Sequence, residues 1–169
     1  MIKVFQTIHG KPHGDCMRAA FCSLCEIADI NSVPNFIDFG DEWYEKLNES
    51  IEKAGYKLND EVPFLYNPKL YLLENPTGYC FKGYEKCAKH LSFESLGKYD
   101  GVGGYFFASV YSPLLFKYND WTCHAVIVNK NFQIVHDPNK KNEGIKFYPF
   151  AGLIGYNGIR DIWNIEKIK

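Results

Sequence analysis

Residues 14–30 read GDCMRAAFCSLCEIADI. From Met17 to Ile30 almost every side of a helix drawn on this segment is apolar, which is typical of a helix buried in a protein core. The glycine and aspartate before it form a start signal, because Asp15 can cap the free backbone N–H groups of the first turn. We therefore predict a central helix over 17–30 that is capped by Asp15 and carries Cys16 in its first turn.

The rest of the first half predicts helices and irregular chain. Residues 42–54, EWYEKLNESIEKA, alternate carboxylates and lysines around large apolar side chains, which indicates an amphipathic surface helix ended by Gly55. Residues 61–83 are rich in Pro, Asn, Gly and Tyr, so we expect mostly irregular structure there. A short helix is expected over 84–91.

The second half changes to the pattern of β-strands. Four segments are short, aromatic or β-branched, and bounded by turn residues: 104–111, 123–129, 132–136 and 145–148. We therefore predict a single α+β domain over 1–169. Its N-terminal helical lobe spans about 1–100 and its C-terminal antiparallel sheet lobe spans about 101–169.

Composition and charge exclude several classes of protein. The 169 residues are 46% hydrophobic and 23% charged, which is ordinary globular usage and excludes a disordered chain. The formal net charge of −1 argues against binding nucleic acid or an anionic membrane by bulk charge. We find neither a secretory signal nor a stretch of the roughly 18 apolar residues of a membrane span. The prediction is a cytoplasmic protein with reduced thiols.

A predicted hairpin brings two ionisable residues together. If Lys130 and Asn131 form a two-residue turn, His124 falls directly opposite Asp137 on the neighbouring strand. Lys-Asn is a poor match for a turn that needs positive φ at both positions, so a three-residue loop with a slipped register is the alternative. His124 and Asp137 remain near neighbours in both cases.

These residue types are the parts of an activated thiol. A cysteine in the first helical turn faces unbonded N–H groups and the positive end of the helix dipole, and both favour thiolate. An imidazolium held by a carboxylate favours thiolate further and supplies a proton to a leaving group. We therefore predict Cys16 as nucleophile, His124 as base and acid, and Asp137 as the residue that orients the imidazole. His136 points to the opposite face of its strand and is a poor base.

The order of these residues resembles a known family. Gln6 is followed by GDCMRAA at 14–20, CHAVIV at 123–128 and HDP at 136–138. This pattern is similar to the papain-like cysteine peptidase clan, and most of all to the group that trims double-glycine leader peptides and its stand-alone phage-encoded relatives. The VPNF stretch at 33–36, soon followed by Trp43, also resembles the phage-encoded relatives.

The resemblance implies a papain-like fold with its central helix starting at the nucleophile. It also implies that Gln6 donates its side-chain amide to the oxyanion, alongside the backbone N–H of Cys16; losing one such donor typically costs on the order of 3 kcal/mol in the barrier. The implied activity is hydrolysis of a peptide or isopeptide bond through a thioacyl intermediate. The implied partner is a peptide or protein substrate, with a host protein in the bacterial cytoplasm as a candidate if the chain is phage-encoded.

Further residues have competing interpretations. We place Trp121, three residues before His124, at the substrate site, where it would cover the base from water; a core or rim tryptophan is the alternative. His9 and His13 fit solvated loop residues better than a cleft entrance. A non-catalytic binding or inhibitor protein on the same scaffold is the alternative to an enzyme, although an intact four-residue site argues against it.

We expect no metal or other cofactor. Cys22 and Cys25 lie inside an apolar helix, where small thiols pack as hydrophobes. The Cys87–His90 pair lacks the short loop of a structural zinc site. The glycine-rich stretch 99–104 lacks the order G-x-G-x-x-G and a following helix, which argues against a nucleotide loop.

Overall fold

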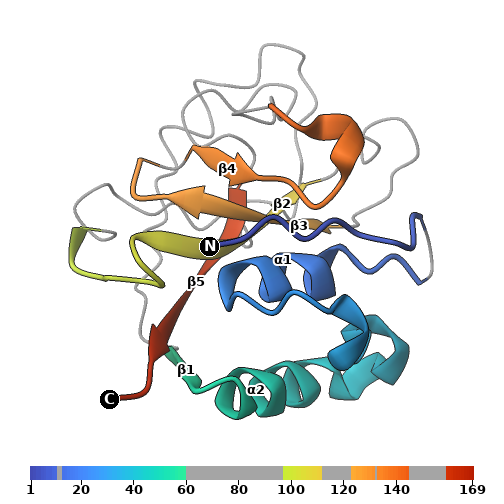
Figure 1. Cartoon of the computed structure of the whole chain (residues 1–169), viewed down its shortest axis with the longest axis horizontal. Coiled ribbons are helices and arrows are strands. Elements are labelled where there is room, and N and C mark those ends of the chain that lie inside the picture. Colours follow the sequence, from blue (N-terminus) through green and yellow to red (C-terminus); the bar gives the residue numbers. More distant parts are fainter. Residues whose placement is uncertain (11–12, 60–96, 112–122, 132, 145–158) are drawn as a thin grey trace, which may run out of the picture.

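The computed structural model describes residues 1–10, 13–59, 97–111, 123–131, 133–144 and 159–169. Its α-helices are α1 (Cys16–Leu24) and α2 (Trp43–Lys53), with short 3-10 helices at Ile30–Ser32, Phe36–Glu42 and Lys140–Asn142. Its strands are β1 (Tyr56–Asn59), β2 (Tyr105–Tyr111), β3 (Cys123–Asn129), β4 (Ile134–His136) and β5 (Ile159–Lys167) (Figure 1). No helix in these ranges is long and apolar enough to cross a membrane.

Helix α1 begins where it was predicted and ends earlier. It starts at Cys16, and its residues from Arg18 to Leu24 are buried, as expected for a helix that is apolar on nearly all sides. The predicted end at Ile30 is wrong, because Glu26 adopts a positive φ of 61°. The N–H of Ile27 then bonds the carbonyl of Cys22 at 2.9 Å, closing the helix with a Schellman-type turn that sequence rules associate with glycine.

Helix α2 confirms the amphipathic prediction for 42–54. It spans Trp43–Lys53, buries Leu47 and Ile51, and ends before Gly55, whose φ of +83° reverses the chain. The irregular stretch expected at 61–83 and the helix expected at 84–91 lie outside the described residues.

The five strands form one antiparallel sheet in the order β1-β5-β2-β3-β4. The predicted strands at 104–111 and 123–129 are confirmed as β2 and β3, and 132–136 contains β4. Strands β1 and β5 were not predicted, and the segment 145–148 lies outside the described residues. The α+β class is confirmed, but β1 comes from the first half of the chain, so the sheet is not confined to residues 101–169.

The core lies between α1, the sheet and α2 (Figure 1). Phe21 of α1 is fully buried in one cluster with Phe107 and Ile127 of the sheet and with Leu47 of α2. Each such side chain contributes about 1.5–3 kcal/mol by leaving water. The ring of Trp163 stacks on Phe107 at 5.1 Å and thereby extends this packing toward α2. Helix α1 is thus held from two sides by apolar contacts.

An N-terminal strap, residues 2–8, crosses the molecule between α1 and the β4 side of the sheet (Figure 1). On the helix side, the N–H of Val4 donates to the Ser23 hydroxyl at 2.9 Å, and the N–H of Ile2 donates to the Ser23 carbonyl at 3.3 Å. On the sheet side, the N–H of Gln6 donates to the carbonyl of Pro138 at 2.9 Å. The strap therefore bridges the helix and the loop that follows β4.

Ser23→Ala should destabilise the protein by about 1–3 kcal/mol, because it leaves the buried N–H of Val4 without an acceptor. Ser50→Ala is the matched control: the Ser50 hydroxyl donates to the carbonyl of Lys46 within α2 at 2.8 Å, and its loss should change stability by less than about 0.5 kcal/mol. Urea denaturation measures the free energy of unfolding of both variants, provided that its dependence on urea concentration has the same slope as in the wild type. An equal loss of stability in the two variants would show that the hydrogen bond between Ser23 and the strap does not stabilise the protein more than a hydrogen bond within α2.

Candidate active site

The imidazole of His124 and the carboxylate of Asp137 meet as predicted. Nε2 of His124 lies 2.7 Å from Oδ1 of Asp137. His124 belongs to β3, and Asp137 follows β4 directly. The side chain of Asp137 is 1% exposed and that of His124 is 17% exposed, so their interaction is weakly screened by solvent.

The hairpin reaches this pair by a different register from the two-residue turn. Asn129 pairs with Gln133 at 3.0 Å, so three residues separate the paired positions, which is the alternative left open by the poor Lys130-Asn131 turn chemistry. Oδ1 of Asn129 accepts the N–H groups of Asn131 and Gln133 at 2.9 and 3.0 Å, and this bonding stabilises the longer loop. The prediction of a two-residue turn at Lys130-Asn131 is wrong because the Asn129 side chain forms hydrogen bonds that favour the longer loop.

A loop after β4 orients the Asp137 carboxylate. The N–H of Asn139 donates to Oδ1 at 2.7 Å, and Nδ2 of Asn142 donates to Oδ2 at 3.3 Å. Sequence analysis did not assign these two residues a role. The Asp-Pro-Asn order is a signal that could have found the first of them, because an aspartate commonly accepts the N–H two residues further on.

Cys16 is the first residue of α1, and its sulfur meets the imidazole of His124. Burial raises the pKa of the Cys16 thiol, but the hydrogen bond and the charge of His124 outweigh it, together with the N–H groups of Ala125 and Met17. The net pKa of Cys16 is therefore below its ordinary value. The structure thus brings together Cys16, His124 and Asp137.

The pKa of His124 moves in the opposite direction. Burial lowers it, but hydrogen bonds to Asp137 and Cys16 and the charges of both partners raise it well above the ordinary value. A lowered thiol pKa and a raised imidazole pKa leave a range of pH in which Cys16 is thiolate and His124 is imidazolium. This charge state is that of an activated nucleophile.

Two other cysteines of the same region have unactivated thiols. Burial raises the pKa of Cys22 to about 11 and that of Cys25 to about 12. Both are free, buried thiols that pack in the core with α1. Cys87 and His90, the other half of the weighed zinc set, lie outside the described residues.

The side chain of Gln6 faces its own segment in this structure. Its Nε2 donates to the carbonyl of Ile8 at 3.2 Å and contacts Nδ1 of His9 at 2.8 Å. Oε1 of Gln6 is buried and has no hydrogen-bond partner in the part of the chain that the structure describes. The oxyanion role expected for Gln6 stays a prediction, and it requires Nε2 to leave these two partners.

The remaining predicted site residues lie elsewhere. His13 makes an exposed ion pair with Asp38 at 3.0 Å, which agrees with a solvated loop residue. Trp121, expected at the substrate site, lies outside the described residues. Asp15 is the residue before α1, yet its side chain makes no capping bond to the helix. The capping prediction is wrong because the strap offers its carboxylate other donors, including the N–H of Thr7 at 3.0 Å.

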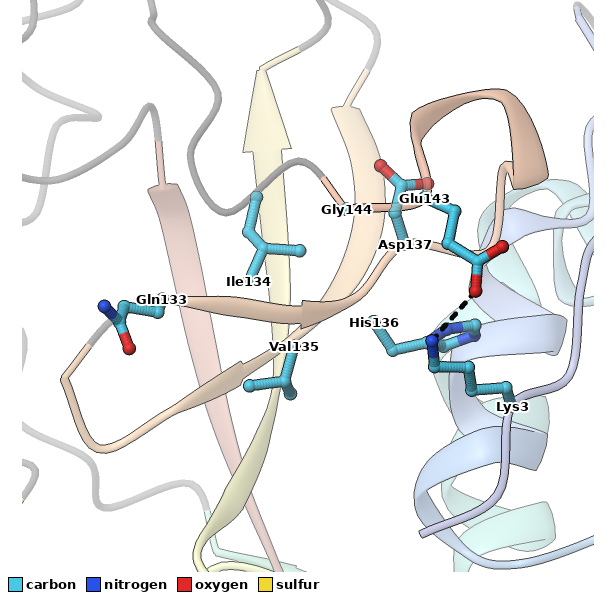
Figure 2. A pocket seen from close by; sticks show the side chains of 8 residues that line it. All are labelled: Lys3, Gln133, Ile134, Val135, His136, Asp137, Glu143 and Gly144. Atoms are coloured by element: carbon cyan, nitrogen blue, oxygen red, sulfur yellow. Dashed lines mark hydrogen bonds and ion pairs between the residues drawn. The ribbon is translucent and has the colours of Figure 1, made fainter.

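His136 bonds the N-terminal strap and not Cys16 or His124. Its Nε2 donates to the carbonyl of Val4 at 2.8 Å, and burial lowers its pKa. A pocket of about 280 Å³ lies beside it, and Lys3 and Glu143, which line this pocket, form an ion pair 2.9 Å long. Figure 2 shows Gln133 at one end of the pocket and this ion pair at the other. Asp137 lines this pocket, but Cys16 and His124 do not, so the pocket is separate from the contact between the thiol and the imidazole.

Asp137→Asn should lower the pKa of His124 by about 1–3 units, because the charge that raises it is removed while the burial that lowers it remains. Titration of the histidine ring protons by NMR measures this shift. Asp100→Asn is the control, since the Asp100 side chain is fully exposed and its substitution should leave the His124 titration unchanged. An unchanged pKa in Asp137→Asn would contradict the electrostatic role of this carboxylate.

No protein-family model, no curated protein and no solved structure matches this chain. Inference about its activity therefore depends on the geometry around Cys16. That geometry consists of a half-buried thiol at a helix start, an imidazole in contact with it, and a carboxylate held behind the imidazole.

Proposed function

We propose that this chain is a cysteine hydrolase of papain-like architecture that cleaves an amide bond, peptide or isopeptide, through a thioacyl intermediate. One observation carries the proposal: His124 joins the Cys16 thiol at the start of α1 to the buried carboxylate of Asp137. This is the arrangement of nucleophile, base and orienting group that covalent catalysis requires.

In the first half of the reaction, the Cys16 thiolate attacks the carbonyl carbon of the substrate. Nε2 of His124 is bonded to Asp137, so Nδ1 is the ring nitrogen left to face the sulfur. The tetrahedral intermediate collapses when the imidazolium gives its proton to the leaving amine. The acyl group then remains on the sulfur as a thioester, and His124 is neutral.

In the second half, neutral His124 accepts a proton from water, and the resulting hydroxide attacks the thioester carbon. The C–S bond breaks, the carboxylic acid product leaves, and the thiolate–imidazolium pair is restored. Asp137 holds the imidazole in one orientation through both halves and stabilises its charged form, as carboxylate partners of catalytic histidines do.

The oxyanion of the intermediate needs hydrogen-bond donors near the sulfur. The N–H groups at the start of α1 face this region, and we assign that of Cys16 as one donor. Gln6 is the second donor if its Nε2 turns from the carbonyl of Ile8 toward the substrate. The strap would then serve catalysis as well as packing.

The papain-like architecture is supported by the order and packing of the elements. A buried helix that starts at the nucleophile comes first, and the strands that supply the base and the orienting acid follow. Helix α1 packs on the antiparallel sheet through Phe21, Phe107 and Ile127. We propose a peptide or protein as substrate, and a cytoplasmic location fits a nucleophile that must stay reduced.

At pH of about 6, iodoacetamide should alkylate Cys16 faster than the other cysteines, because an ordinary thiol with pKa near 8.5 is almost entirely protonated there. His124→Gln should slow the alkylation of Cys16 roughly tenfold or more, since it removes the charge that favours thiolate. Peptide mapping by mass spectrometry gives the rate at each cysteine. Equal rates for Cys16 in the two proteins would refute the activated thiol.

Cleavage itself is measured on a peptide library derived from bacterial cell lysate, with new termini identified by mass spectrometry. The wild-type chain should generate new termini, and both Cys16→Ser and His124→Gln should lose at least about 99% of that rate. Asp100→Asn again serves as the control for a surface substitution. If Cys16→Ala keeps every effect of the wild-type protein in cells, the chain acts by binding and the hydrolase proposal fails.

A further inference from the structure

The carboxylate of Asp15, one residue before the nucleophile, is buried and fully engaged. It is 0% exposed. Its Oδ1 accepts the N–H groups of Thr7 and Ile8 at 3.0 and 2.9 Å. Its Oδ2 accepts the hydroxyl of Thr7 at 2.8 Å and Nη2 of Arg18 at 2.7 Å. One side chain therefore ties the strap to the start of α1.

This bonding leaves the first turn of α1 without a side-chain cap. The first backbone bond of the helix runs from the N–H of Ala19 to the carbonyl of Asp15 at 3.0 Å. An aspartate at this position would ordinarily accept an N–H of the first turn. Here the backbone N–H of Met17 instead helps to lower the pKa of the Cys16 thiol. Diverting the carboxylate to the strap thus keeps the first-turn donors available to the nucleophile.

A buried carboxylate next to a thiolate raises an electrostatic difficulty. Two negative charges so close in sequence repel each other, and burial weakens solvent screening. Arg18 offsets this repulsion, since its side chain is 10% exposed and pairs with Asp15 from the first turn of α1. Nε of Arg18 has no hydrogen-bond partner among the described residues, so Asp15 is the group that compensates its charge.

We infer that Asp15 and Arg18 form a positioning pair for Cys16: Asp15 fixes the strap to the start of the helix, and Arg18 cancels the charge that Asp15 would impose on the thiolate. This inference rests on the proposed function of Cys16 as a nucleophile. Neither residue touches the substrate. Both act through the helix start and through the strap that carries Gln6.

Other charged groups also face this region. His124 approaches the sulfur from β3, with Asp137 behind it, and the Cys22 thiol lies nearly two turns further along α1. His13 and Asp38 pair at the exposed side of the loop before the helix. None of these groups changes in the variants below, so a shift in Cys16 reactivity reports the substituted pair.

The test compares the pH midpoint of Cys16 alkylation in four full-length proteins: wild type, Arg18→Gln, Asp15→Asn and the double variant. Arg18→Gln should raise the midpoint by about half to one pH unit, because three donors from the strap keep Asp15 ionised without its cation. Asp15→Asn should lower the midpoint by a similar amount, since a cation then remains alone. The double variant should return close to wild type.

Opposite shifts separate this inference from simple structural damage, which would move both single variants toward an ordinary thiol. Shifts in the same direction, or no shift in either variant, would overturn it. Lys46→Gln is the matched control, because Lys46 and Glu49 form an ion pair with the same spacing on exposed α2, 3.0 Å long. That variant should keep the wild-type midpoint.

If Arg18→Gln does not fold, as judged by circular dichroism, Asp15→Asn and Arg18→Lys test the inference in its place. Arg18→Lys keeps the cation and should have the wild-type pH midpoint of Cys16 alkylation, whereas Asp15→Asn must still lower that midpoint. The proposed function fails separately, when wild-type Cys16 has an ordinary midpoint near pH 8.5 and no peptide is cleaved. The inference fails when the wild-type midpoint is low but the variants do not shift in opposite directions.

Discussion

Hydrogen bonds of the N-terminal strap hold the two halves of the site in register. Apolar packing presses α1 against the sheet, but such packing has no direction and tolerates small sliding movements. The strap adds directed contacts on both sides, from Val4 to Ser23 of α1 and from Gln6 to Pro138 beyond β4. A thiol on a helix and an imidazole on a strand need this kind of fixed geometry, because a hydrogen bond between them weakens steeply outside a narrow range of distances and angles.

Burial alone would inactivate the Cys16 thiol, and the contrast with Cys22 shows why it does not. Both residues lie in α1, and burial raises the thiol pKa at both positions. Cys16 differs because an imidazole and backbone N–H groups meet its sulfur, and in a dry site those contacts are stronger than in water. Burial is therefore compatible with a lowered thiol pKa only at the start of α1, where His124 and backbone N–H groups contact the sulfur.

Local patterns predicted those parts of the fold that local interactions determine. The end of α2 at Gly55 and strands β2 and β3 follow from glycine and periodicity rules, and the apolar pattern after Cys16 predicts the buried face of α1. Strands β1 and β5 pair although they are far apart in the sequence, Tyr56 with Lys167, and no local rule contains that contact. The prediction that Asp15 caps α1 is wrong for a related reason. The capping rule considers only the N–H groups of the helix itself, whereas the strap supplies other donors to this carboxylate.

The contact between His124 and Asp137 was predicted more accurately than the hairpin that builds it, and the position of Asp137 explains the difference. A register error of one residue ordinarily turns a side chain to the other face of a sheet. Asp137 escapes this consequence because β4 ends at His136, so the pleat no longer fixes its direction. Asn139 and Asn142 bond the carboxylate instead, and it lies 2.7 Å from Nε2 of His124. His136, still inside the strand, obeys the alternation and bonds the strap.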